Sequence, residues 1–192
     1  FFPAFAEIQS DKEALRGAIQ KAVVVGSYLI MPTALFVAVA AEPLVALLLT
    51  EKWLACVLVF QLVCVQNLGL MLGIVNLRAY MALGHSGLYL KLQLIKVLSG
   101  LVIISGIAIL LHNIYRVALA ACVHGLLCVF IDLAPAKRMH GLGSLSQIRS
   151  VMPTLFVALL AAGLALVPLA FDISYALQLL LQIVIYVGVY LA

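Results

Sequence analysis

Two basic side chains, Arg78 and Lys96, lie within long apolar segments of the chain, one on either side of residues 84–87, which read Gly-His-Ser-Gly. If this short stretch is a turn between two helices, Arg78 lies roughly 9 Å before the turn and Lys96 roughly 13 Å after it, at about 1.5 Å per residue. An antiparallel hairpin would therefore bring the two cations to similar depth. This arrangement suits an anionic substrate such as phosphate or pyrophosphate, because Arg and Lys form charge-assisted hydrogen bonds with its oxygens.

The segment after the turn also carries a polar stripe, because Gln93, Lys96 and Gly100 recur at steps of three and four residues. These positions share one face of a helix, and we expect that face to meet protein or water rather than lipid. Arg78, Lys96 and Gln93 are accordingly the predicted substrate-binding residues. The alternative is that Arg78, Lys91 and Lys96 only extend to the lipid headgroups and set the orientation of the chain in the membrane.

The acidic residues are placed differently from these cations. Glu42 lies near the end of the first apolar segment, where it could be a gate, a partner for Lys52 or a cap at a helix break, and we favour the structural role. Asp132 is expected to face the basic loop 137–149, and Asp172 to lie in an outer turn. No carboxylate is then left in the middle of the membrane, where ion-driven exporters commonly hold one to bind the coupling ion.

The last apolar segment carries a further polar pattern, and the second apolar segment carries a pair of glycines. Polar residues recur at steps of three and four in the last apolar segment and would share about a third of a helix circumference: Tyr175, Gln178, Gln182, Tyr186 and Tyr190. This face would line a groove for sugar or lipid, or it would form a packing seam between helices. Gly69 and Gly73 form a pair of small residues that is typical of close helix packing.

The remaining reactive residue types show no pattern typical of an enzyme or a metal site. The four histidines, at positions 85, 112, 124 and 140, lie apart in the sequence, and we expect no carboxylate or cysteine partner for them. The four cysteines, at positions 56, 64, 122 and 128, fall in apolar stretches and are expected to be buried thiols. No phosphate-binding loop or nucleophile elbow is present in the sequence. We therefore expect no enzymatic activity, no metal and no cofactor.

Composition defines the class of protein that must position these residues. Hydrophobic residues make up 67% of the 192 positions and charged residues 9%, and the mean hydropathy is +1.27. A water-soluble domain has about a quarter of its residues charged, so this chain must face lipid. The net charge of +4 comes from basic residues scattered between apolar runs, which argues against nucleic acid as a partner.

An apolar helix of about 20 residues crosses the bilayer core of about 30 Å. On this measure the chain divides into six segments, at 22–49, 54–77, 92–111, 114–133, 151–170 and 174–192. We expect an all-α integral membrane protein in which residues 22–135 form the four-helix part of one bundle and residues 151–192 a trailing helix pair. Residues 1–21 would be an amphipathic cytoplasmic linker and residues 136–150 a cytoplasmic loop. Pro32 is expected to kink the first segment.

The basic residues predict the orientation, because short cytoplasmic loops carry an excess of Lys and Arg. Lys52 and Arg116 fall in connections on one side of the membrane. The other nine of the 11 basic residues fall on the opposite side, in alternation with the six segments: Lys12, Arg16, Lys21, Arg78, Lys91, Lys96, Lys137, Arg138 and Arg149. We therefore predict that this richer side is cytoplasmic.

Three blocks of the sequence are similar to one known family. They are residues 2–9 with 11–16, which read FPAFAEIQ and DKEALR; residues 41–45 with 51–53, which read AEPLV and EKW; and residues 79–86, which read AYMALGHS. In this order and spacing they resemble the polysaccharide and O-antigen flippases of the multidrug/oligosaccharidyl-lipid/polysaccharide exporter superfamily. The similarity covers most of residues 1–135, whereas the last two segments match only as generic apolar helices.

The resemblance implies a transporter of two pseudo-symmetric helical bundles that moves undecaprenyl-pyrophosphate-linked oligosaccharides across the bacterial inner membrane. The chain would be the C-terminal bundle with its trailing helices, and it looks truncated at both ends. Its partners would be the lipid-linked oligosaccharide, membrane lipids and the N-terminal bundle that this sequence lacks.

Three alternatives stay open: a drug or cation exporter of the same superfamily, a membrane-embedded enzyme of glycan assembly, and a non-functional remnant. A carboxylate in the cavity would favour the exporter, and acidic and histidine residues clustered on one membrane face would favour the enzyme.

Overall fold

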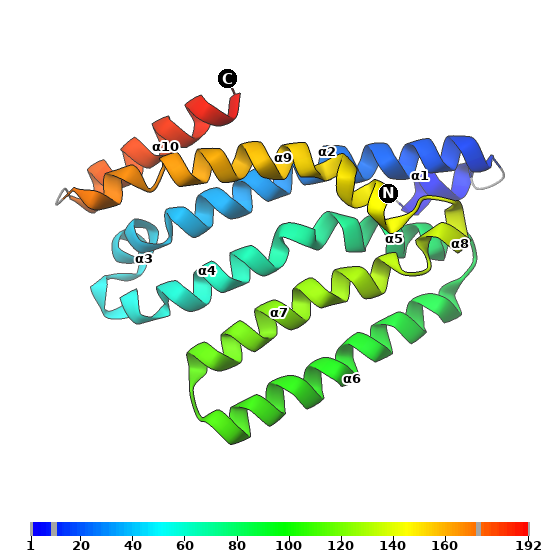
Figure 1. The fold of residues 1–192 in the computed structure, drawn as a ribbon, viewed down its shortest axis with the longest axis horizontal. Helices are drawn as coiled ribbons and strands as arrows, with labels where there is room; N and C mark the ends of the chain where they lie inside the picture. Colours follow the sequence, from blue (N-terminus) through cyan, green and yellow to red (C-terminus); the bar gives the residue numbers. More distant parts are fainter. Residues whose placement is uncertain (1, 9–10, 172–173, 192) are drawn as a thin grey trace.

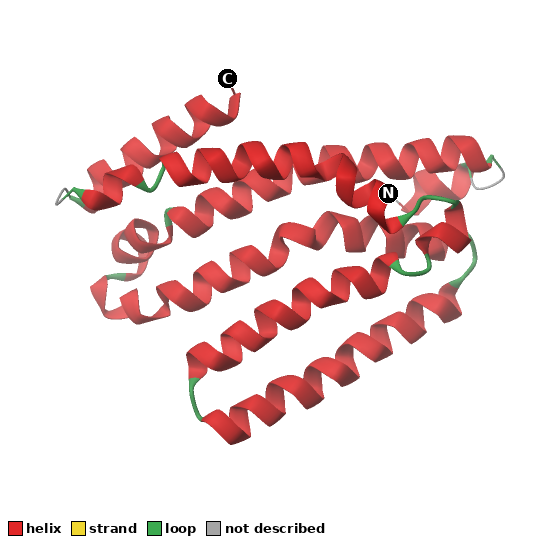
Figure 2. Cartoon of the chain, in the orientation of Figure 1, coloured by secondary structure: helices red, strands yellow, loops and turns green. Residues whose placement is uncertain are grey.

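The computed structural model describes residues 2–8, 11–171 and 174–191. Asp172, for which we expected an outer turn, lies outside these residues. In chain order the elements are the α-helices and 3-10 helices (η) α1 (Phe2–Glu7), α2 (Lys12–Val39), α3 (Ala41–Leu49), η1 (Glu51–Cys56), α4 (Val57–Gln66), η2 (Asn67–Gly69), α5 (Leu70–Ala82), α6 (Ser86–Leu111), α7 (Ile114–Leu133), α8 (Ala136–His140), α9 (Ser144–Leu164), η3 (Val167–Ala170) and α10 (Tyr175–Leu191). The described chain contains helices and connecting loops but no strand (Figure 2).

The apolar composition appears in the structure as membrane-length helices. Within the described residues, five helical stretches are long and apolar enough to cross a bilayer: Lys12–Val39, Glu51–Ala82, Ser86–Leu111, Ile114–His140 and Ser144–Leu169. Tyr175–Tyr190 is a shorter apolar helix. The expected all-α, multi-pass membrane fold is therefore confirmed, with five long spans and a shorter sixth helix where we expected six spans.

The helices lie roughly side by side (Figure 1). At one edge, α10 packs against α9 and α3, and α9 packs against α2. Helix α2 in turn packs against α4 and α5, and α4 and α5 both pack against α7. Helix α6 lies at the far edge, against α7 and α5. Many of its large side chains are exposed, including Val97, Leu101 and Leu110, which suits a surface that faces lipid.

Helix α2 begins earlier than the sequence pattern indicated. The Asp11 side chain caps it by accepting hydrogen bonds from the backbone N–H groups of Glu13 and Ala14, both at 3.0 Å. The helix then runs without interruption to Val39, so the linker that we expected to end at residue 21 is continuous with the first span. Its early residues Leu15 and Ile19 are buried in the main hydrophobic core.

Pro32 lies inside α2, and two backbone carbonyls at this position, those of Tyr28 and Pro32, accept hydrogen bonds from α10. Proline has no backbone N–H, so the carbonyl of Tyr28, four residues earlier, loses its helical donor. The Tyr190 hydroxyl donates to this carbonyl at 2.8 Å, and the Tyr186 hydroxyl donates to the Pro32 carbonyl at 2.7 Å. Tyr186 is buried, and so are Gln178 and Gln182. The polar face of the last segment therefore packs against α2, as expected for a packing seam, and Tyr186 and Tyr190 also line a pocket of about 350 Å³ beside it, so the groove interpretation stays open.

The second span is built from four short elements, η1, α4, η2 and α5, and packs closely on α7. A Cβ atom at Gly69 would come 2.5 Å from the Val129 side chain, and one at Gly73 would come 2.9 Å from the Asp132 carboxylate. The prediction that these two glycines allow close helix packing is confirmed.

The two ends of the helix layer have different compositions. One end holds the start of α2, the α5–α6 turn and α8, whereas the other holds η1, the α6–α7 turn and η3 (Figure 1). Lys52 belongs to η1 and Arg116 to the first turn of α7, and both elements begin at the second end. The basic-rich connections lie at the first end. This separation agrees with the alternation on which the predicted orientation depends.

Candidate functional site

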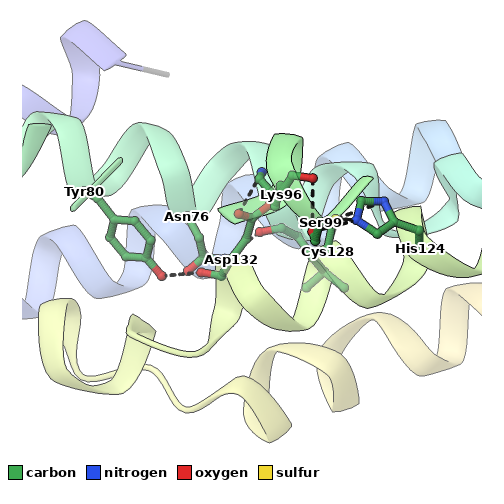
Figure 3. A network of polar contacts seen from close by, with 8 residues as sticks. Asn76, Tyr80, Lys96, Ser99, His124, Cys128 and Asp132 are labelled. Atoms are coloured by element: carbon green, nitrogen blue, oxygen red, sulfur yellow. Dashed lines mark hydrogen bonds and ion pairs between the residues drawn. The ribbon is translucent and has the colours of Figure 1, made fainter. Parts of the chain in front are cut away.

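The site centres on an ion pair inside the helix layer. Lys96 on α6 reaches Asp132 on α7: its Nζ lies 2.9 Å from Oδ1 and donates a hydrogen bond to Oδ2 at 3.0 Å. The Lys96 side chain is 16% exposed and that of Asp132 is 7% exposed. Figure 3 shows the two side chains pointing toward each other between the helices. Removal of either partner would leave a poorly solvated charge uncompensated.

Asp132 corrects the prediction from sequence. We expected this carboxylate to face the basic loop 137–149 and to leave the membrane interior without an acid. The structure instead buries it against Lys96. The reason is that Asp132 lies at the end of α7, where the helix still packs on α5 and α6. The backbone carbonyl of Asp132 also accepts a hydrogen bond from the buried Tyr80 hydroxyl at 2.7 Å, and this bond fixes α7 to α5.

A pocket of about 340 Å³ surrounds the ion pair, within the range of about 300–1,000 Å³ that is typical of small-molecule sites. It lies between the η2–α5 region, α6 and α7, and its polar lining residues are Gln66, Asn67, Gln93, Lys96, His124 and Asp132. The pocket thus joins one cation and one carboxylate to three amides and an imidazole, which is a set able to bind a polar headgroup by hydrogen bonds.

The second part of the site is a contact between Ser99, His124 and Cys128. Ser99 Oγ lies 3.0 Å from His124 Nε2, and Cys128 Sγ lies 3.7 Å from the His124 ring nitrogens. His124 has room because Gly100 faces it, and a Cβ at that position would come 3.0 Å from the imidazole. We expected no cysteine partner for any histidine, and Cys128 corrects that expectation for His124. Figure 3 shows these residues beside the ion pair, on the same two helices.

The predicted site residues are only partly brought together. Gln93 and Lys96 both line the pocket, and Gly100 packs against His124, so the polar stripe faces protein as expected. Arg78 is exposed on α5 and is not among the residues that line the pocket, and Lys91 is exposed on α6. Substrate binding by Arg78, Lys96 and Gln93 stays a prediction.

Glu42 lies at the opposite end of the layer, in the first turn of α3. Helix α2 ends at Val39 and α3 starts at Ala41, so Glu42 follows a helix break directly. It lines a pocket of about 370 Å³ together with Gln61 and Tyr115. The structure shows no ion pair between Glu42 and Lys52 in its described part. A carboxylate in the first turn of a helix is favoured by the helix dipole, in agreement with a structural role.

A second polar network, which sequence reasoning missed, joins α5, α8 and α9. Asn76 Nδ2 donates to Gln147 Oε1 at 2.7 Å, and Gln147 Nε2 donates to Asn76 Oδ1 at 3.2 Å. The same Asn76 oxygen lies 2.9 Å from His140 Nε2, and the His140 ring stacks on Tyr80 at 5.9 Å. Asn76, Gln147 and His140 are all buried. Asn76 and Gln147 are 71 residues apart, so no local spacing pointed to this contact.

The cysteines form no disulfide in the described structure and belong to no cluster of metal ligands there. All four cysteines are free, and only Cys122 is fully buried, whereas Cys56 is exposed. The expectation of four buried thiols is therefore wrong for Cys56. Within the described parts of the chain, no three His, Cys, Asp or Glu side chains are grouped to hold a metal ion.

The fold and the site together define a class: a multi-pass α-helical membrane protein with a buried charge pair in a polar pocket. Comparison with known proteins adds a more specific similarity for the N-terminal part. Residues 1–58 match a family model described as polysaccharide biosynthesis protein. The chain is also similar to an uncharacterized membrane protein in the cps region of Klebsiella pneumoniae, with 42% identity over 64 residues, or 33% of this chain.

These matches cover limited parts of the molecules. The matched segment spans 13% of the length of the Klebsiella protein, and the family match ends at residue 58, before the pocket residues Gln93, Lys96 and Asp132. No solved structure matches the chain. The N-terminal part is thus similar to polysaccharide biosynthesis proteins, while the pocket has to be interpreted from its own geometry.

Proposed function

We propose that the chain is part of a transporter that flips lipid-linked oligosaccharides during polysaccharide biosynthesis, and that Lys96 binds the anionic headgroup of the substrate. The observation that carries the proposal is a lysine inside a polar pocket of a membrane-spanning helix layer, held by a single carboxylate. An ionisable side chain inside a membrane is costly and defaults to a functional interpretation. The similarity of residues 1–58 to polysaccharide biosynthesis proteins supports the choice of substrate class.

The pocket chemistry fits a phosphate or pyrophosphate group. Lys96 offers a cation, and the Gln93, Gln66 and Asn67 side chains offer amide N–H donors to further oxygens. The lipid tail of such a substrate would stay in the bilayer, against the exposed apolar surface of the helices. In this proposal the chain acts together with a further helical bundle of the same transporter, which closes the other side of the substrate path.

The test is transport in a strain whose own flippase is deleted, with the full-length protein supplied on a plasmid. We expect Lys96→Gln to reduce transport strongly at unchanged protein level, and Lys96→Arg to be milder because it keeps the charge. Lys91→Gln is the matched control, since Lys91 is exposed on the same helix five residues earlier. Normal transport by the Lys96→Gln variant would remove the proposed role of this side chain.

Arg78 separates two versions of the proposal. It is exposed outside the pocket, so it contributes to binding only if its side chain faces the substrate path in the full-length transporter. Reduced transport by Arg78→Gln, at unchanged level and topology, would place it on that path. Normal transport would make it an orientation anchor and would leave Lys96 as the basic residue of the site.

A cation exporter of the same superfamily is the second candidate, and Asp132 is the observation that favours it. A carboxylate inside the pocket is the feature that such an exporter needs. Lys96 neutralises this carboxylate, so the intact pair carries no net charge, and a ligand of either sign has to displace one of its two members. Efflux assays with organic cations decide: export that is lost in Asp132→Asn would support the exporter, whereas lipid-linked sugar transport that depends on Lys96 would support the flippase.

A further inference from the structure

We propose that Asp132 is an internal competitor for the substrate anion at Lys96, and that the anion displaces it with the uptake of one proton. This inference rests on the proposed function, because it takes the pocket as the site of an anionic headgroup. It assigns Asp132 a role in binding, and it states that Asp132 takes up a proton when the anion binds to Lys96.

The geometry of the pair supports the competition. Lys96 Nζ lies 2.9 Å and 3.0 Å from the two carboxylate oxygens, so Asp132 occupies the position in which a phosphate oxygen would accept hydrogen bonds from the same ammonium group. The Asp132 oxygens have no other hydrogen-bond partner among the described residues. An anion that takes Lys96 therefore leaves the carboxylate without its hydrogen-bond and ion-pair partner.

The energetics of an unpaired carboxylate then require a proton. Asp132 is buried, and Gly73 faces it so closely that a Cβ there would come 2.9 Å from Oδ2. Breaking a buried ion pair by removing one partner is strongly unfavourable, because the remaining charge is left uncompensated. Protonation removes that charge. In balanced form, the paired ammonium and carboxylate plus an anion and one proton give an ammonium–anion pair and a neutral carboxylic acid.

The lining of the pocket in the described structure offers Asp132 no other lysine or arginine to replace Lys96. On the helices that pack against α7 in the described structure, the titratable groups near Asp132 are Lys96 on α6 and Tyr80 on α5, with Cys64 on α4 farther along. On α7 itself, Cys128 and His124 lie one and two turns away. Arg78 and Lys91 are exposed and outside the pocket. A displaced Asp132 would therefore remain uncompensated unless it is protonated.

The experiment measures proton uptake by the purified full-length protein in detergent on binding of inorganic pyrophosphate. Calorimetry in two buffers with different ionisation enthalpies gives the number of protons taken up. Asp132→Asn serves as the reference, because it keeps the shape of the side chain, leaves Lys96 without a competitor and shares any proton uptake that belongs to pyrophosphate itself.

We expect the wild type to take up about one proton more than Asp132→Asn. Its affinity should also fall about tenfold more per pH unit as the pH rises, since one linked proton gives a slope difference of one. Asp132→Asn should bind pyrophosphate more tightly at neutral pH. A second measurement needs no variant: infrared difference spectra of the wild type should gain a protonated-carboxyl band on pyrophosphate addition, and the band should shift when aspartate is labelled with ¹³C.

The outcomes separate this inference from the proposed function. Suppose that pyrophosphate binding requires Lys96, that the wild type and Asp132→Asn take up equal numbers of protons, and that no carboxyl band appears. This result would overturn the displacement and protonation of Asp132, but the assignment of Lys96 as an anion site would remain. Absence of binding in the wild type, or equal binding by Lys96→Gln, overturns both.

Discussion

The Tyr190 hydroxyl on α10 donates a 2.8 Å hydrogen bond to the carbonyl of Tyr28 on α2, the carbonyl that Pro32 leaves without its helical donor. The two tyrosine rings also meet at a centroid distance of 5.3 Å. A break in the hydrogen bonding of one helix is thus satisfied by the side chain of another, 162 residues away in sequence. This relationship makes the position of α10 dependent on the proline in α2.

The first prediction follows from this dependence. Tyr190→Phe should lower the free energy of unfolding by about 1 kcal/mol, because a carbonyl inside the bilayer loses its donor. In a Pro32→Ala background the restored backbone N–H can serve the Tyr28 carbonyl, so Tyr190→Phe should cost less there. Thermal or denaturant unfolding of the four proteins measures the coupling, and Tyr175→Phe is the control at the start of α10. Equal costs in both backgrounds would contradict this account.

The second prediction concerns the amide pair of Asn76 and Gln147. Replacing Asn76 by Leu removes the partner of the buried Gln147 amide and of His140, at a cost of about 1–3 kcal/mol. Gln147→Leu should cost less, because Asn76 keeps its contacts with His140 and with the Leu72 carbonyl, and the double replacement should cost less than the sum of the two. A double-mutant cycle by unfolding of the purified protein gives the interaction free energy. Asn67→Leu is the control, since the side-chain hydrogen bond of Asn67 in the described structure goes to the nearby Val63 carbonyl, four residues earlier. Strict additivity would show that the reciprocal bonds contribute nothing.

The third prediction uses glycine to test the space around the ion pair. Gly73→Ala places a methyl group 2.9 Å from Asp132 Oδ2 and should destabilise the protein by about 1–3 kcal/mol through overpacking. Gly106→Ala meets nothing within 4 Å and should be neutral or stabilising by about 0.5–1 kcal/mol, because alanine favours a helix. Unfolding midpoints of both variants provide the comparison. A tolerated Gly73→Ala would mean that α5 and α7 pack less closely than described.

The fourth prediction concerns orientation. Cys56 is exposed on η1, at the end opposite the basic-rich connections, and Ser146 is exposed near the start of α9. With the other three cysteines replaced by alanine, Cys56 should react with an impermeant maleimide in intact cells. A Ser146→Cys variant that lacks Cys56 should react only after the membrane is opened. Labelling of position 146 in intact cells would reverse the orientation.

The sequence was sufficient to predict the membrane class, the approximate spans and the inward face of the Gln93–Lys96–Gly100 stripe, because all of these follow from local periodicity and hydropathy. The partner of Lys96 was missed, since it lies 36 residues away and its place at the end of the expected span 114–133 suggested that it faces the basic loop 137–149. A signal was present: His124, Cys128 and Asp132 recur at steps of four and share one helical face. The Asn76–Gln147 pair had no comparable local signal.

The glycines that face α7 have a mechanical consequence. Val129, Asp132 and His124 each project against the backbone of a neighbouring helix, at Gly69, Gly73 and Gly100. Each of these side chains fits only where the facing residue is a glycine. A shift of α7 along α5 or α6 by even one residue would therefore bring them into steric clash with backbone or with larger side chains. Helices α5, α6 and α7 would therefore move as one rigid body. The pocket around Lys96 and Asp132 lies among these helices, so its walls would keep their relative positions during such a motion.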